Sequence, residues 1–507
     1  MVILIGLGSF EKWVYTGGEQ ESSMGGELLP PDSHMFPFLQ VLIIRECPRL
    51  LGLPFPNHIV SLDWFPKLQE LEVTNCRVFS SVILISWIES MCRVMMQNVK
   101  LLAHFWYSKS SSGAELAIIG KADLHSIDQV LVFDKETGLE TLRLDKCPPL
   151  ESKHLLMLTS LKKLIVVDSD CLVGPLGGGQ GDVEWQLPVE DIWIEGLNGN
   201  TGDELTELLP HLPRLSELEI WKCQNIKKLV VGVDVQQKTL EASEMVGGEI
   251  TTAAEEEDDG VLLFPPHLSD SLLELEFYWC EELVLVNLPT LVPGGGGLQA
   301  LRSLQRLRIQ NCPKLLSTFS FSLEPLSNLS SLTSLELDNC GEDLKCQGLW
   351  SLLTTGGQLK ELTVRGSHRF FAGWDPNPRQ ALEVAEGGEE QQTQLVLSTL
   401  RELRTDDIAG LLAAPVCRFL SSSLTKLALN GYWLEGMERF SKEQEDALQL
   451  LSSIQELKFL YFKDLQQLPA GLRNLTSLKR LGIYNCSEVL KQQCRGLEGT
   501  IPGVEII

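Results

Sequence analysis

Positive charge is scarce in this 507-residue sequence, and this scarcity bears on whether the chain binds nucleic acid. The chain has 42 lysines and arginines against 68 aspartates and glutamates, which gives a net charge of −26. A broad nucleic-acid-binding face is built from clustered lysine and arginine, so a chain this acidic is not expected to present one. We therefore do not expect nucleic acid among its partners.

Motifs that carry catalytic or metal chemistry are also missing. The sequence contains no Gly-x-x-x-x-Gly-Lys-Ser/Thr loop for nucleotide phosphates, no Gly-x-Ser-x-Gly and no His-Glu-x-x-His. Its eight histidines include no pair at the spacing of helical metal ligands, and its 13 cysteines include no Cys-x-x-Cys. We expect a binding protein that is not an enzyme and that uses no cofactor or metal.

Long uninterrupted apolar runs are absent as well. The longest apolar stretch, residues 82–107, contains Glu89, Arg93, Lys100 and His104, so a membrane span is not expected. The first eight residues are apolar, but they lack a basic residue and are too short for a signal peptide. They are better interpreted as part of a strand.

What the sequence does contain is a recurring pattern, Leu-x-x-Leu-x-Leu-x-x-Cys-x-x-Leu, with other apolar residues at some of the leucine positions. The clearest copy is Leu304, Leu307, Ile309, Cys312 and Leu315. The two apolar residues of Leu-x-Leu face the same side of a strand, because strand side chains alternate. One such coil cannot bury its apolar side alone, so neighbouring coils must stack.

This pattern is that of a leucine-rich repeat. It predicts an α/β repeat solenoid: a curved horseshoe with a parallel sheet on its concave face and an irregular or short-helical convex side. The cysteine lies in the turn that leaves the strand, where a thiol acts as a small buried apolar group and a weak donor. Eight cysteines occupy this place and are predicted structural thiols: Cys47, Cys76, Cys147, Cys223, Cys280, Cys312, Cys340 and Cys486.

Cysteines used in this way are not available for disulfides, which favours a reducing compartment. We expect the cytoplasm, with the nucleus as a second location.

The copies are unevenly spaced, and the gaps between them divide the chain. Degenerate copies include Ile127, Val130 and Val132, only 12 residues before the copy that begins at Leu139. That step is too short for a full coil, so one of the two assignments is expected to be wrong. The predicted segments are a partial N-terminal repeat and loop (1–35), repeats (36–80), a partly helical insertion (81–126), repeats (127–230), an acidic flexible loop (231–268), repeats (269–490) and a C-terminal tail (491–507).

Candidate binding residues are the strand residues that point away from the core. Trp193, Trp221 and Tyr278 fall on successive recognised repeats, among carboxylates that include Glu219 and Glu276. Exposed aromatic residues of this kind dominate protein-binding hot spots. A predicted basic patch, Arg306, Arg308 and Arg365, follows on later repeats. The alternative is that these aromatic residues are covered by the long excursion between Leu215 and Leu272 or by another domain.

Residues 36–50 (FPFLQVLIIRECPRL) and 301–315 (LRSLQRLRIQNCPKL) carry a fuller signature, Leu-x-x-Leu-x-Ile-x-x-Cys-Pro-x-Leu. This signature resembles the C-terminal repeats of plant, grass-type, coiled-coil NB-ARC disease-resistance proteins. Residues 4–13 look like the middle of such a repeat, and residues 468–507 are similar to the terminal repeat and tail. The resemblance implies an intracellular immune-receptor scaffold that binds a pathogen effector or a guarded host protein and restrains an NB-ARC domain.

The nucleotide-binding part of that family is absent from this sequence, which suggests a truncated form. Two other classes are weighed against the receptor. A leucine-rich-repeat adaptor of a ubiquitin ligase would show an N-terminal F-box segment, and residues 1–35 do not. A cell-surface repeat receptor would show Leu-x-Gly-x-Ile-Pro in successive coils, and this sequence has no such series.

Overall fold

The computed structural model describes residues 1–13, 36–53, 59–60, 65–133, 138–174, 186–199, 201–233, 260–288, 297–354, 357–374, 376, 398–434 and 436–507. The chain forms two compact units, Met1–Leu215 and Ser216–Ile507. No helix in the described ranges has the length and apolar character needed to cross a bilayer.

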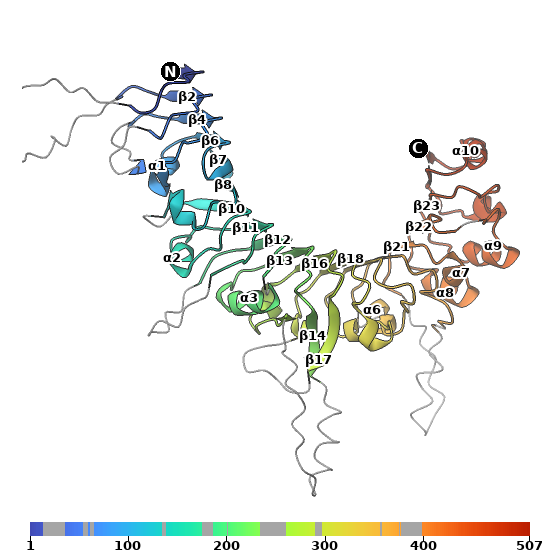
Figure 1. Cartoon of the computed structure of the whole chain (residues 1–507). Coiled ribbons are helices and arrows are strands. Elements are labelled where there is room, and N and C mark those ends of the chain that lie inside the picture. Colours follow the sequence, from blue (N-terminus) through green and yellow to red (C-terminus); the bar gives the residue numbers. More distant parts are fainter. Residues whose placement is uncertain are drawn as a thin grey trace, which may run out of the picture. The chain divides into compact units, whose positions relative to one another are not determined.

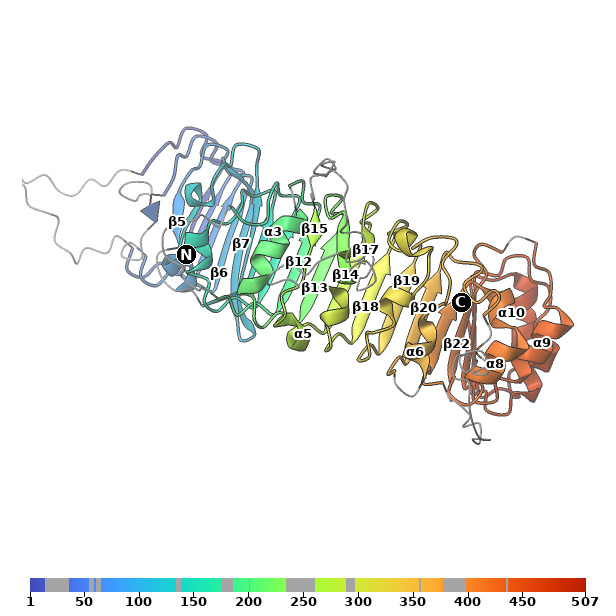
Figure 2. The ribbon, with the colours of Figure 1, turned by 90° about the horizontal axis from the view of Figure 1, so that it is seen from below.

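The second unit is a stack of short strands joined side by side in one parallel sheet (Figures 1 and 2). Each strand pairs in register with the next, so that Leu218, Leu275 and Leu307 form part of one buried row. The strands are β13 (Glu217–Trp221), β16 (Glu274–Tyr278), β18 (Arg306–Gln310), β19 (Ser334–Asp338), β20 (Glu361–Arg365), β21 (Glu402–Thr405), β22 (Lys426–Asn430), β23 (Glu456–Leu460), β24 (Arg480–Tyr484) and β25 (Gly503–Ile506).

The other side of this unit is built from short helices, short strands and turns. In Figure 1 the helices lie on the side of the coils opposite the sheet, as the pattern predicted. They are α5 (Leu268–Ser271), α6 (Leu349–Leu353), α7 (Ile408–Leu411), α8 (Ala414–Leu420), α9 (Lys442–Gln449) and α10 (Glu488–Arg495). A small parallel sheet is formed by β14 (Lys228–Val233), β15 (Val261–Leu262) and β17 (Val284–Leu288).

The first unit has the same plan with one change of strand direction. Its main-sheet strands are β1 (Val2–Ile5), β2 (Val41–Arg45), β4 (Glu70–Thr74), β6 (Arg93–Gln97), β7 (Leu102–Ser110), β8 (Gly113–Gly120), β10 (Leu139–Asp145), β11 (Lys163–Val167) and β12 (Asp191–Glu195). Strand β7 runs antiparallel to both β6 and β8, whereas β8 pairs in parallel with β10. The other elements are helices α1 (Ile85–Glu89), α2 (Ser152–Leu155) and α3 (Thr201–Leu208) and a small sheet of β3 (Ile59–Val60), β5 (Val82–Leu84) and β9 (Leu131–Val132).

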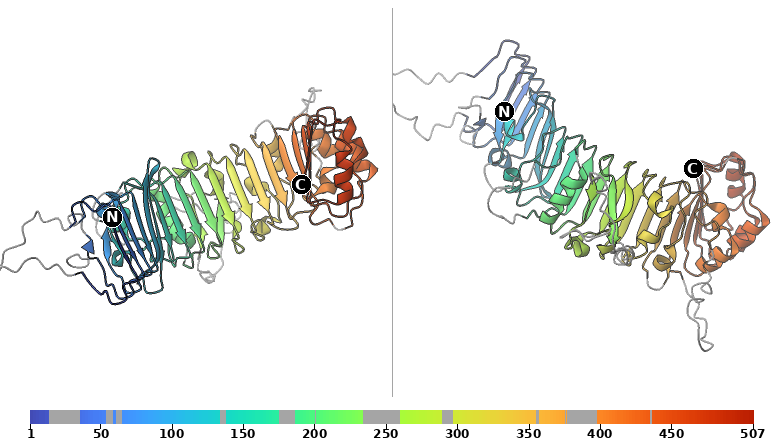
Figure 3. Two further views of the ribbon diagram at one scale, coloured as in Figure 1. Left: turned by 90° about the horizontal axis from the view of Figure 1, so that it is seen from above. Right: turned by 60° about the horizontal axis from the view of Figure 1, so that its bottom comes forward.

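Together these features confirm the predicted α/β leucine-rich-repeat solenoid. Figure 3 shows the strands of the second unit as an ordered row. In β18 the side chains of Leu307 and Ile309 are buried while Arg306, Arg308 and Gln310 are not, so this strand contributes two residues to the core. The core therefore runs along the length of each unit as a column of stacked side chains.

The segment predicted as a partly helical insertion, residues 81–126, differs from that expectation. Only α1 is an α-helix there, and β6 is an ordinary repeat strand paired in parallel with β4. Its core positions hold Met91, Val94, Met96 and Val99, so the frame of the repeat is kept without leucine or cysteine. The antiparallel hairpin β7–β8 then extends the same sheet.

Two other expectations are resolved by the strand assignments. Residues 127–132 do not form a main-sheet strand: Ile127–Gln129 is a 3₁₀ turn, and β9 belongs to the small sheet. Leu139 begins the true strand, because a 12-residue step cannot complete a coil.

The C-terminal tail contains most of α10 and all of β25, which pairs with β24. Residues 234–259 of the predicted acidic loop lie outside the described residues, and β14 and β15 flank them.

All eight pattern cysteines are buried, and each thiol donates to the carbonyl oxygen two residues earlier. Representative Sγ–O distances are 3.4 Å for Cys47, 3.3 Å for Cys223 and 3.5 Å for Cys312. Ser169, which takes the same place in its repeat, donates to Val167 in the same way at 3.1 Å. The 13 cysteines are all free thiols.

Thiol labelling of the native protein tests this arrangement. Burial raises the pKa of Cys147 and Cys340 to about 12, so almost no thiolate forms at these sites at neutral pH. Cys92 is exposed and should react first with a maleimide, whereas the eight pattern cysteines should react on the order of 100-fold more slowly, through opening of the fold. A Cys92→Ser variant should lose the fast phase, and labelling of Cys312 as fast as Cys92 would contradict the prediction.

Candidate protein-recognition face

The outward residues of the second unit form columns across the sheet, because every strand pairs in register with its neighbour. The central column begins Glu219, Glu276, Arg308, and the column at the strand ends begins Trp221, Tyr278, Gln310. We call the outward surface of β13, β16, β18, β19 and β20 the recognition face. Six predicted site residues lie next to one another on it: Trp221, Tyr278, Glu219, Glu276, Arg308 and Arg365.

Two aromatic rings are stacked at the start of this face, where Trp221 is partly exposed and Tyr278, expected to be exposed, is only 6% exposed. The ring centroids of Trp221 and Tyr278 are 3.8 Å apart and the planes differ by 18°. The Tyr278 hydroxyl donates to Glu276 at 2.5 Å, and Trp221 Nε1 donates to Glu219 at 3.3 Å. Burial and the neighbouring Glu276 carboxylate raise the pKa of Tyr278, so its hydroxyl stays protonated and remains a donor.

Arg308 connects the aromatic stack to the rest of the face. Its Nη1 donates to Glu276 at 3.1 Å and to the Tyr278 hydroxyl at 3.0 Å, and its Nε donates to Glu336 at 2.8 Å. Because Glu276 is only 6% exposed, its charge depends on this arginine for compensation. Arg308 therefore holds both the carboxylate and the phenol in one geometry.

The network continues across the next two strands. Arg365 donates to Glu336 at 3.1 Å and lies 2.6 Å from an oxygen of Asp338. Gln310 also donates to Glu336, at 3.0 Å. Burial raises the pKa of the Asp338 carboxyl, and the Arg365 guanidinium opposes that rise. Cross-strand pairs of opposite charge thus run from β16 to β20.

The predicted basic patch takes a different form in the structure. Arg306 pairs with Glu274 at 2.5 Å, and Arg308 and Arg365 pair with the carboxylates of the network. The three arginines therefore belong to a mixed-charge surface. Trp193 belongs to the first unit, where it lies on β12 beside Ile165 of β11.

The sequence prediction did not single out a second group of aromatic residues, which follows β22 and β23. Tyr432 and Trp433 are 55% and 54% exposed, and their ring centroids are 4.9 Å apart. Tyr461 packs edge-on against Tyr432 at 5.7 Å and has a φ of 60°, a left-handed conformation that is rare for an aromatic residue. The only sequence signal was the run Gly-Tyr-Trp directly after a strand.

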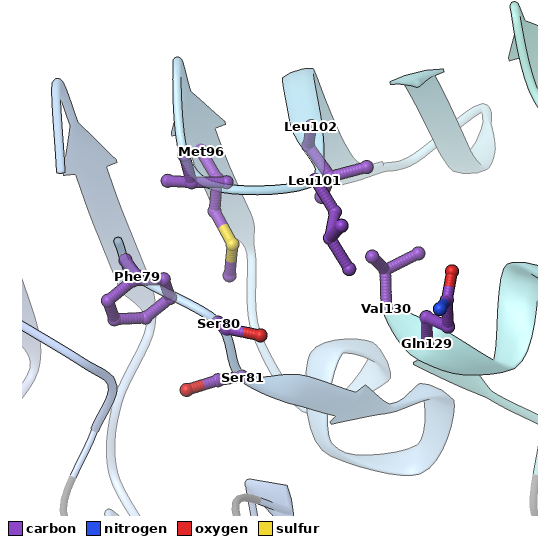
Figure 4. Close-up of a pocket in the computed structure, with 9 residues that line it drawn as sticks. Phe79, Ser80, Ser81, Met96, Leu101, Leu102, Gln129 and Val130 are labelled. Atoms are coloured by element: carbon purple, nitrogen blue, oxygen red, sulfur yellow. The ribbon is translucent and has the colours of Figure 1, made fainter. Parts of the chain in front are cut away.

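Metal binding has no support in the described residues. No group of three or more His, Cys, Asp or Glu residues in these parts of the chain could hold a metal ion. A narrow gap in the core of the first unit is lined by side chains that include Phe79, Met96, Leu101 and Val130 (Figure 4). Its lining includes no titratable side chain, so the gap is a packing feature of the core.

Replacing Arg308 by alanine tests the role of the network. The variant leaves the buried Glu276 carboxylate without its cation, and we expect it to lower the free energy of unfolding by about 2 kcal/mol. Arg306→Ala is the matched control, because its more exposed pair with Glu274 should contribute less than about 1 kcal/mol. Adding Glu276→Gln to Arg308→Ala should restore part of the loss in urea unfolding. Equal effects of the two arginine variants would contradict the assigned role.

The matches of this chain to known proteins are to solved structures. No family model matches the sequence, and no curated protein does. Among solved structures, the chain is similar to a leucine-rich-repeat protein of Leptospira interrogans, with 12% identity, a TM-score of 0.27 and coverage of 89% of this chain and 92% of that one. It is also similar to the plant peptide hormone receptor RGFR1 in complex with RGF2, with 12% identity, a TM-score of 0.19 and coverage of 92% and 84%.

Proposed function

We propose that this chain is the protein-recognition scaffold of a plant intracellular immune receptor. In this role it senses a pathogen effector or a guarded host protein and restrains an NB-ARC domain until that protein binds. The Leu-x-x-Leu-x-Ile-x-x-Cys-Pro-x-Leu signature supports the receptor assignment, and the free, buried thiols suit the cytoplasm or the nucleus.

The observation that carries the binding role is the stack of Trp221 on Tyr278 within a network of charged side chains. Aromatic side chains supply most of the energy at protein interfaces, and their contribution is larger when the free protein already holds them in place. Here the hydrogen bonds from Tyr278 to Glu276 and from Arg308 to Tyr278 fix the ring before a partner arrives. Binding then immobilises fewer side chains.

The charged residues around the stack are suited to selecting a partner. Glu276, Arg308 and Glu336 place alternating charges on successive strands, with Glu276 almost covered and Arg308 and Glu336 partly exposed. A partner whose charges do not complement this order would leave groups desolvated and unpaired, which costs affinity. The aromatic stack therefore supplies affinity, and the charge order supplies specificity.

Long-read sequencing of the transcript across the region that encodes Met1 tests the receptor proposal. We expect the message to continue upstream, in frame, into a nucleotide-binding domain with a phosphate loop. An F-box segment there would instead support a ubiquitin-ligase adaptor, and a signal peptide would support a cell-surface receptor. Either of these results would overturn the proposal.

A variant of the recognition face tests the binding role within the full receptor. Trp221→Ala should change regulation in a leaf cell-death assay, either by releasing cell death without an effector or by abolishing the response to it. Removal of a hot-spot residue typically weakens binding about 30-fold, which is enough to shift such a switch. Glu488→Ala is the control, because Glu488 is a highly exposed residue of α10. A Trp221→Ala receptor that behaves like the wild type at equal protein level would contradict the assignment.

A further inference from the structure

The second unit carries an open pocket at the edge of the sheet where three neighbouring strands begin. It has a volume of about 550 Å³. We call it the basic pocket; its lining residues come from the segments just before β20, β21 and β22. They are Gly357, Gln358, Lys360, Ser398, Thr399, Arg401, Ser422, Ser423 and Thr425.

Backbone hydrogen bonds hold the main chains of the two cationic residues of the pocket, Lys360 and Arg401, side by side. Arg401 N donates to Lys360 O at 2.8 Å, and Thr425 N donates to Arg401 O at 2.9 Å. These bonds belong to the start of the sheet ladder, where adjacent strands are about 4.8 Å apart. The spacing of Lys360 and Arg401 is therefore set by the fold itself.

Among the described residues, no carboxylate of the lining compensates the charge of the pocket. Its lining contains one lysine and one arginine and no carboxylate, in a chain whose net charge is −26. Neither Lys360 nor Arg401 forms an ion pair within the described part of the chain. In the first unit the contrast is clear: Lys162, at the same place before its strand, pairs with Glu140 at 2.9 Å.

The hydroxyl groups of the lining separate into two kinds. Thr399 and Thr425 already donate to backbone carbonyl oxygens of the sheet edge. Ser423 Oγ, in contrast, is buried and has no hydrogen-bond partner among the described residues. A buried hydroxyl without a partner costs free energy, so an acceptor brought by a ligand would be favoured there.

From this geometry we propose that the basic pocket binds a phosphate group. A phosphate monoester carries a charge of about −1.5 to −2 at neutral pH and three acceptor oxygens. The Arg401 guanidinium, the Lys360 ammonium and the Ser423 hydroxyl can donate to these oxygens. A single carboxylate offers only two oxygens and one charge, and arginine recognises phosphate with a two-pronged geometry. The site is independent of the proposed receptor role.

Calorimetric titration of the full chain tests the site with three probes. These are inorganic phosphate, a phosphoserine peptide and the same peptide without phosphate, and acetate serves as the control anion. Lys360→Gln and Arg401→Gln should each raise the Kd for the phosphorylated probe about tenfold, because each removes a charge-assisted contact. Binding should also weaken as salt is raised.

Lys463→Gln is the matched control, because Lys463 is an exposed lysine that follows β23 and is not part of the pocket. It should leave the Kd unchanged, and thermal unfolding of each variant should show that the fold is intact. If the phosphopeptide binds more tightly than inorganic phosphate, the pocket binds a phosphate group carried by a partner. If the two bind equally, the pocket binds the free phosphate ion. Binding of acetate as tight as that of phosphate, or equal loss in Lys463→Gln, would overturn the proposal.

Discussion

The fold depends on one backbone arrangement, the hydrogen bond that crosses between repeats at the turn ending each strand. The residue before the pattern cysteine adopts a left-handed conformation, as at Asn311 with a φ of 56°, and its N–H donates to the next repeat. Asn311 N reaches Asp338 O at 2.7 Å, and Lys222 N reaches Tyr278 O at 2.8 Å. The parallel ladder therefore continues one residue beyond the strand while the chain turns inward. That turn places the thiol under the strand it has just left.

The left-handed conformation is stabilised by the backbone hydrogen bond to the next repeat and does not depend on the type of residue that adopts it. Asparagine occurs at several of these places, as its tolerance of positive φ would predict. Trp279 and Tyr461 occupy the same place with φ values of 59° and 60°, although bulky residues are disfavoured there. Their N–H groups still donate to the next repeat, each at 2.9 Å. The repeated backbone bond outweighs the local strain.

The fold could be predicted from the sequence because buried positions need apolar residues at fixed spacing. The prediction failed for repeats whose buried positions hold neither the leucine nor the cysteine of the pattern. Leu307, Ile309 and Cys312 reveal a repeat because a strand with one buried face needs apolar residues at fixed spacing. The repeat of β6 was missed because Val94 and Met96 satisfy the same burial without leucine. The antiparallel β7 was missed because alternation alone does not reveal strand direction. On the recognition face, aligning the repeats predicted which residues share a column. The pairing of Arg308 with Glu276 and Glu336 could not be predicted, because it depends on side-chain geometry that the spacing of residues does not encode.

The surface cations of the second unit are of two kinds: some are paired with carboxylates, and others have none in their pocket. On the recognition face, Arg308 and Arg365 are neutralised by carboxylates on neighbouring strands, so a partner there meets a surface that is already paired. Such a surface discriminates by shape and charge order, and removing one of its charges damages the protein itself. At the edge of the same sheet, Lys360 and Arg401 stand together without a carboxylate in their pocket. The cost of holding these two charges close to each other falls when an anion binds between them. Long-range attraction for an anionic ligand should therefore concentrate at this edge, despite the negative charge of the chain as a whole.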